Sequence, residues 1–207
     1  MLLVISSATE AVSLALLDLS DAVLAERHEL IGRGHAERLV QMIAEMLRAS
    51  GERPTAILAD CGPGSFTGIR VGLAAANGLS IGWGVPVSGV SALALLAAGA
   101  PAGRDAAEVA VAMVGGHGEL FVQSFARMPF RALDEPRSLP PEMAVALPQP
   151  LVVGNAAEQL VAARGFGEAL PAHPRAADAR LLPPAFRALP VRPLYVRAPD
   201  AKPGRVA

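Results

Sequence analysis

The glycine-rich stretch CGPGSFTGIRVGLAAANG, residues 61–78, carries the residue types most able to bind an anion. It follows the apolar run ILAD and leads into a long apolar segment. A glycine loop between a strand and a helix directs backbone N–H groups at an anion, and the helix dipole adds to the attraction. The candidate anion-binding residues are Gly62, Gly64, Ser65, Thr67, Gly68 and Arg70.

Spacing excludes two catalytic versions of this loop. A Walker loop needs four residues between its glycines and then Gly-Lys-Ser/Thr, whereas Gly64 and Gly68 enclose three residues and no lysine follows. A hydrolase elbow needs serine at the centre of Gly-x-Ser-x-Gly, and GSFTG has Phe66 there. A conformational role remains, with Gly64 at positive φ and Ser65 or Thr67 capping a helix that begins near Phe66. We favour a tight corner that starts a packing helix, and anion binding stays as the alternative.

Composition limits the class of protein. The chain has 207 residues, a net charge of −1, 18% charged residues and one cysteine. Such a balance gives no basic surface for nucleic acid or acidic membranes, and one cysteine forms no internal disulfide. The N-terminal MLLVISS lacks the basic region of a signal peptide. We expect a cytoplasmic protein with no membrane contact, and the high apolar content suggests a buried partner interface.

Residues 71–103 carry no formal charge over more than the roughly 20 residues that a bilayer requires. Glycines and Pro86 interrupt the segment near its middle. Since these residues break a continuous helix, we predict a buried helix, a strand at 85–87 and a second helix at 91–98.

The order of the remaining elements predicts two lobes. We expect a β-hairpin and a third strand within residues 2–30, a helix at 35–50, a strand at 56–59 and the glycine loop. After a PAGRD linker the pattern restarts with VAVAMV, a GGHG turn and ELFVQSFA, and LVVGNAAEQLVAAR reads as strand, turn and helix. We place an N-terminal lobe at 1–102, a C-terminal lobe at 103–198 and a tail at 199–207, with the Pro-rich stretch 129–150 as loop.

Two helices show unusual packing surfaces. In the glycine-loop helix, small residues recur every fourth position, so another backbone can approach closely. In the helix at 35–50, apolar residues cover about 200° of the circumference, about twice the usual stripe. Ile43 should face the core, and we predict that the edge with its methionines binds a partner, although both faces packing inside one domain fits equally well. The predicted partner interface is Leu39, Met42, Met46, Gly68, Gly72, Ala76 and Ser80.

These motifs resemble the TsaB/YeaZ family. The resemblance rests on GPGSFTGIRVG, VISSATEAVSLALLD, GHAERLVQMI, the GEL turn and PLYVR, and it is densest over residues 1–98. It implies an α/β, actin-like and sugar-kinase-like fold of two lobes, each opening on a β-hairpin of a mixed sheet flanked by helices. It also implies a non-catalytic subunit for making threonylcarbamoyladenosine beside the tRNA anticodon. The implied partners are a TsaD-like catalytic subunit and a TsaE-like ATPase, with a homodimer when alone and tRNA contacted only through the complex.

Departures from the family pattern favour the interpretation that this protein is a non-catalytic subunit. The first strand usually ends in Ile-Asp-Thr, but Ser6 stands in place of the aspartate. The second hairpin usually carries Asp-Ala-Arg, replaced here by Val114, Gly115 and Gly116. Without those carboxylates an Mg–nucleotide is harder to hold. We therefore expect no cofactor in the isolated chain, with ATP or ADP bound only in the assembled complex.

No catalytic or metal site is expected from the other reactive residues. No two histidines have His-x-x-x-His spacing, so we predict no metal site. Cys61 fits a small buried thiol, and His35 fits a capping or solvated residue. One alternative is an actin-fold ATP-dependent phosphotransferase or hydrolase that uses the glycine loop. Another is a tRNA-binding module using Arg187, Arg192 and Arg197.

Overall fold

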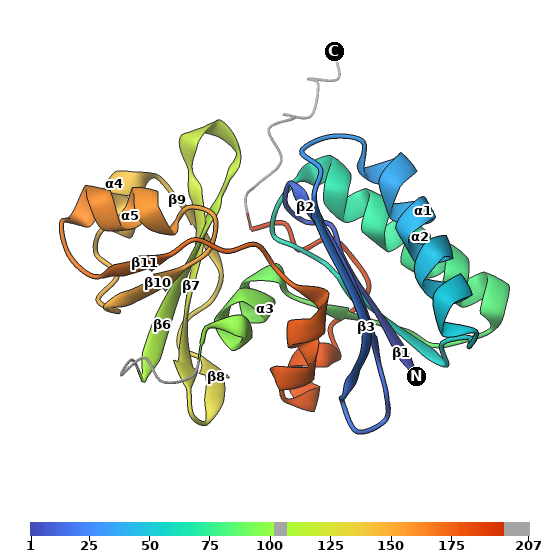
Figure 1. Cartoon of the computed structure of the whole chain (residues 1–207). Helices are drawn as coiled ribbons and strands as arrows, with labels where there is room; N and C mark the ends of the chain where they lie inside the picture. Colours follow the sequence, from blue (N-terminus) through green and yellow to red (C-terminus); the bar gives the residue numbers. More distant parts are fainter. Residues whose placement is uncertain (102–106, 197–207) are drawn as a thin grey trace, which may run out of the picture.

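The computed structural model describes residues 1–101 and 107–196 and has two lobes, each built on a mixed β-sheet (Figure 1). This confirms the expected α/β architecture of two lobes, in which each lobe opens on a β-hairpin of a mixed sheet. The boundary that we placed between residues 102 and 103, and the tail at 199–207, lie outside the described residues.

The first lobe contains a five-stranded sheet in the order β3-β2-β1-β4-β5. β1 and β2 form an antiparallel hairpin, while β4 runs parallel to β1 and β5 parallel to β4. β2 is buried along its whole length because its apolar sequence has a covered face on both sides. The elements are β1 (Leu2–Ser6), β2 (Ala11–Leu17), β3 (Val23–Leu30), α1 (His35–Ser50), β4 (Ala56–Asp60), α2 (Phe66–Trp83), β5 (Val87–Val90) and α3 (Ala92–Gly99).

The second lobe repeats this plan in the order β8-β7-β6-β10-β11, with β9 also paired to β7. β6 and β7 form the hairpin, and β10 and β11 follow in parallel. The elements are β6 (Glu108–Val114), η1 (Gly116–Gly118), β7 (Leu120–Arg127), β8 (Phe130–Ala132), β9 (Arg137–Leu139), α4 (Pro141–Ala144), β10 (Leu151–Val153), α5 (Ala157–Arg164), β11 (Glu168–Leu170), η2 (Ala176–Leu181) and η3 (Pro184–Arg187).

Helices fill the space between the sheets and cover their outer faces. α1 and α2 lie side by side on the outer face of the first sheet, α4 and α5 lie beyond the second, and α3 and η2 lie between the two (Figure 1). One continuous apolar core runs from the first sheet through α3 to β6 and β7, and a smaller one lies under α4 and α5. Within the described ranges, no helix combines the length and the apolar character that crossing a membrane requires.

Three details differ from the sequence prediction. The strand expected at 85–87 forms at Val87–Val90. The Pro-rich stretch 129–150 is not only loop, because it contains β8, β9 and α4. The chain also returns to the first lobe near its end, where Leu189 exchanges backbone hydrogen bonds with Gly89 and Leu194 N–H donates to the Cys61 carbonyl. The predicted range 103–198 therefore contains a segment that packs on the first sheet.

Candidate functional site

The glycine loop forms a tight corner between β4 and α2. The Ser65 hydroxyl accepts a hydrogen bond from Gly68 N–H, so Ser65 is the N-cap and α2 begins at Phe66, as predicted. Gly64 has a φ of 158°, and a Cβ built on it would overlap the carbonyl oxygen of Ala8. This glycine is required because the corner presses on the backbone that follows β1.

The donors of this corner are largely used within the chain. Gly62 N–H donates to the Asp60 carboxylate at 2.8 Å, and Ser65 N–H donates to the Ala8 carbonyl at 2.7 Å. Gly68 N–H is taken by the N-cap, while Thr67 is exposed to solvent. A phosphate needs several converging N–H groups, and these three already have acceptors. The geometry thus supports the corner more than the anion loop.

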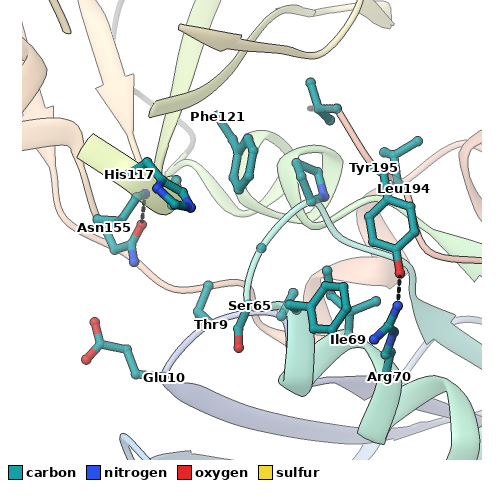
Figure 2. A pocket seen from close by; sticks show the side chains of 18 residues that line it. Thr9, Glu10, Ser65, Ile69, Arg70, His117, Phe121, Asn155, Leu194 and Tyr195 are labelled. Atoms are coloured by element: carbon teal, nitrogen blue, oxygen red, sulfur yellow. Dashed lines mark hydrogen bonds between the residues drawn. The ribbon is translucent and has the colours of Figure 1, made fainter. Parts of the chain in front are cut away.

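Arg70 contacts two aromatic side chains. Its guanidinium lies 3.4 Å from the centre of the Phe66 ring and donates to the Tyr195 hydroxyl at 3.0 Å (Figure 2). The Phe66 and Tyr195 rings are stacked with centroids 6.2 Å apart. These side chains join the start of α2 to the end of the described chain.

A buried carboxyl group lies beneath the corner. Ser6, at the position where the family usually has aspartate, donates its hydroxyl to Asp60 on the neighbouring strand at 2.7 Å. Burial raises the pKa of Asp60 to about 6. Burial, with a contribution from the Asp60 charge, also raises the pKa of Cys61 to about 11, which keeps this buried thiol protonated at neutral pH. Neither Asp60 nor Cys61 is among the residues that line the cleft between the two lobes.

The predicted partner edge of α1 is wrong. Leu39, Met42 and Met46 are 0%, 0% and 2% exposed and belong to the core of the first lobe. Ile43 is buried with them, as expected. The apolar arc of α1 is wider than the part that is buried, and the edge with the methionines is the one that faces the sheet.

The small-residue ridge of α2 is also internal. A Cβ on Gly68 would overlap the Ser7 carbonyl oxygen, and one on Gly72 would overlap the Ser7 hydroxyl. Ala76 is fully buried, and half-buried Ser80 donates its hydroxyl to the Val85 carbonyl. The ridge does allow close approach, but to Ser7, directly after β1 of its own lobe, and not to a partner.

The surface that sequence reasoning missed is the outward face of α1 and α2. Val40 is 61% exposed and Ile81 is 84% exposed. α2 spans 18 residues, yet its only charged residue is Arg70, whereas a surface helix normally exposes a charged face. Placing α2 on a helical wheel, as was done for α1, would have revealed it. The outer helix face, as we name this surface, consists of the exposed residues Val40, Ala44, Ala74, Gly78 and Ile81.

A cleft of about 750 Å³ opens between the lobes beside the glycine corner. The first lobe contributes Thr9 and the start of α2, and the second contributes the β6–β7 turn with Phe121 and Asn155 (Figure 2). The three residues that replace the family's Asp-Ala-Arg also line it: Val114, Gly115 and Gly116. Its walls are mainly apolar, so the cleft differs from a nucleotide-phosphate site.

The other candidate residues have structural partners. His35 is buried and its Nε2 lies 2.7 Å from the Thr9 carbonyl, which corrects the expectation of a capping or solvated residue. Arg187 forms a bidentate pair with Asp21, and Arg192 is exposed, while Arg197 lies outside the described residues. Among the residues that the structure describes, no three His, Cys, Asp or Glu side chains gather into a possible metal site.

Comparisons with known proteins agree with this architecture. Residues 25–159 match the family model described as TsaD, tRNA N6-adenosine threonylcarbamoyltransferase. The tRNA threonylcarbamoyladenosine biosynthesis protein TsaB of Escherichia coli is 38% identical over 129 residues, which are 61% of this chain and 55% of that protein. An uncharacterised protein of Mycobacterium tuberculosis is 30% identical over 97% of this chain and 93% of its own.

The solved structure of YeaZ from Pseudomonas aeruginosa superposes with a TM-score of 0.78 at 29% identity, covering 94% of this chain and 98% of that one. The matched region spans only about half the length of the TsaB proteins of E. coli and Haemophilus influenzae. The family model, the relatives named TsaB and the YeaZ structure lead to one conclusion: the chain belongs to the TsaB/YeaZ family.

Proposed function

We propose that this protein takes part in making threonylcarbamoyladenosine at position 37 of tRNA, as a non-catalytic scaffold that docks a TsaD-like catalytic subunit. The observation that carries the docking role is the outer helix face, where α2 exposes Ala74, Gly78 and Ile81 with almost no charge. Exposed apolar residues on adjoining helices are typical of a protein interface.

The match to the TsaD model supports a TsaD-like subunit as the partner. A chain that matches the TsaD model over residues 25–159 has a lobe plan related to that of TsaD. Two related lobes can pair through the same two helices about an approximate twofold axis, in the way that identical subunits pair about an exact one. The outer helix face would then form a homodimer when the chain is alone and a heterodimer with the TsaD-like subunit. A TsaE-like ATPase, bound nucleotide and tRNA belong to the assembled complex.

The non-catalytic part of the proposal rests on the glycine corner and the cleft. Three N–H groups of the corner have internal acceptors, and burial keeps the Cys61 thiol protonated. Ser6 and Val114 also replace carboxylates of the family pattern. We expect the purified chain neither to hydrolyse ATP nor to modify tRNA. Turnover that persists through extensive purification and is abolished by Ser65→Ala would contradict this part.

The docking role is tested with Val40→Glu combined with Ile81→Glu. Both side chains are exposed, so thermal melting should stay close to that of the wild type. Two carboxylates placed in an apolar interface should weaken binding to the TsaD-like subunit by about 30-fold or more, measured by sedimentation and titration calorimetry. The rate of tRNA modification by the reconstituted complex should fall in parallel.

Gln159→Glu, on the exposed side of α5 in the second lobe, is the matched control and should leave binding unchanged. A folded double variant that binds the TsaD-like subunit at wild-type strength would refute the outer helix face as the docking surface.

A further inference from the structure

The interlobe cleft has the size and the lining of a small-molecule site, and the scaffold role makes no use of it. Its volume of about 750 Å³ falls within the range of ligand pockets in proteins. Both lobes supply its walls, so the cleft is a product of their packing (Figure 2).

Aromatic side chains dominate two sides of the cleft. Phe66 and Tyr195 are 58% and 52% exposed although both are large and apolar, and their stacked rings form a flat surface. Phe121 lines the cleft from the second lobe (Figure 2). Arg70 holds the flat surface in place through the Phe66 ring and the Tyr195 hydroxyl. A planar ligand would therefore meet aromatic surfaces that are already ordered, and such stacking contributes about 1 to 3 kcal/mol per nucleobase in other proteins.

The charges of the lining select against an anion. The charged side chains among the described lining residues are Glu10 and Arg70, besides the titratable His117. The Arg70 guanidinium is already engaged by Phe66 and Tyr195, and Glu10 adds an acidic side chain to the lining. Among the described lining residues Arg70 is the one guanidinium and no lysine is present, so a phosphate chain would lose hydration with little cationic compensation, which is costly.

One polar group gives the cleft a directional contact. The Asn155 Oδ1 accepts a hydrogen bond from Val114 N–H at 3.0 Å, which fixes the orientation of the amide. Since the oxygen is used in this bond, the amide presents N–H donors at the rim of the cleft. Such donors pair with a ring nitrogen or a carbonyl at the edge of a planar ligand.

We propose that the interlobe cleft binds an uncharged, planar heteroaromatic molecule of nucleoside size, stacked on the Phe66–Tyr195 surface and hydrogen-bonded by Asn155. The site discriminates against the phosphorylated form of the same ligand. It is independent of the docking role, because the outer helix face lies on α1 and α2 and shares no residue with the cleft.

The test is titration of the purified chain with adenosine and, separately, with ATP, followed by calorimetry and by saturation-transfer NMR. Adenosine should bind, and ATP should bind at least about tenfold more weakly because its phosphates find little cationic compensation. Tyr195→Ala and Phe121→Ala should each weaken adenosine binding by about five- to a hundredfold. Tyr195→Phe keeps the ring and should bind nearly as the wild type does.

The matched control is Phe166→Ala. Phe166 is exposed and lies under the guanidinium of Arg164, as Phe66 lies under Arg70, but outside the cleft. Its loss should leave binding unchanged. Thermal melting of each variant separates loss of binding from loss of folding. The proposal is overturned if adenosine gives no saturation transfer, if ATP binds as well as adenosine does, or if folded Tyr195→Ala and Phe121→Ala both bind like the wild type.

Discussion

The two lobes share one arrangement of strands in their sheets and differ in the helices that cover those sheets. In each lobe, the strand that runs parallel to the first strand of the hairpin is followed by a corner that contains glycine and leads into a helix. In the first lobe, a Cβ on Gly64 would overlap the Ala8 carbonyl oxygen, and in the second, a Cβ on Gly154 would overlap the Ala112 carbonyl oxygen. The close approach of this corner to the hairpin is therefore a shared requirement of the fold.

The covering helices differ in length and in exposed chemistry. α1 and α2 have 16 and 18 residues, whereas α4 and α5 have 4 and 8. α2 exposes an almost uncharged face, while α5 exposes Glu158 and Gln159 to solvent. The two similar sheets therefore form the common framework of the fold. The long helices of the first lobe, which the second lobe lacks, supply the surface available to a partner.

The largest effect is expected inside the first lobe. Met42→Glu would place a carboxylate at a fully buried position of α1 and should destabilise the protein by about 4 kcal/mol or more. Val40→Glu, two residues earlier on the exposed side, should change stability by less than about 0.5 kcal/mol. Urea denaturation followed by circular dichroism measures both. Equal midpoints for the two variants would show that the assignment of buried and exposed faces is wrong.

The shared corner is tested by Gly64→Ala and Gly154→Ala. Each adds a Cβ against a backbone oxygen, and Gly154 also has a φ of 130°, so each should cost about 1 to 3 kcal/mol. Gly78→Ala is the control, because it lies in the helical stretch of α2 with open space around it, and it should be neutral or slightly stabilising. If only one corner variant is destabilised in equilibrium unfolding, the two corners are not equivalent.

The first lobe should also carry a pH dependence. The pKa of Asp60 is raised to about 6 in the folded protein from an ordinary value of 3.8, so the protonated form is favoured on folding. Its contribution to stability is complete below about pH 4 and is lost as pH rises through 6, by on the order of 3 kcal/mol. Asp60→Asn should flatten this part of the curve in urea unfolding between pH 4 and 7.

Asp178, in the η2 segment between the lobes, provides the comparison. Burial raises the pKa of Asp178 to about 6 as well, so the stability of Asp60→Asn should still fall as pH rises through 6. The double variant Asp60→Asn with Asp178→Asn should lose this remaining pH dependence. An unchanged pH profile in the double variant would show that these carboxyl groups do not control it.

The smallest effects on stability are expected at two exposed alanines, one in a covering helix of each lobe. Ala74→Lys in α2 and Ala162→Lys in α5 should each change the free energy of unfolding by less than about 0.5 kcal/mol. If the outer helix face pairs the chains, only Ala74→Lys should reduce self-association in sedimentation velocity. Loss of self-association by Ala162→Lys alone would move the pairing surface to the second lobe.

Local sequence determined the elements and their order. The boundaries of α1, the N-cap at Ser65 and the two hairpins follow from periodicity, capping chemistry and turn residues, which act over a few positions. The repeated order of strands and helices then predicted two similar lobes. The width of the apolar arc on α1 also follows from the sequence, because a helical wheel requires only the order of residues in the helix.

Tertiary structure alone decided which side of each helix is covered. The wheel shows that Met42 and Val40 are both apolar, but only the placement of the first sheet buries one and exposes the other. The same applies to Ser6, whose partner Asp60 lies 54 positions away, and to the cleft, where Tyr195 meets Arg70 from across 125 positions. Such contacts depend on how the lobes pack and where the chain returns, and pattern within a short window carries no information about either.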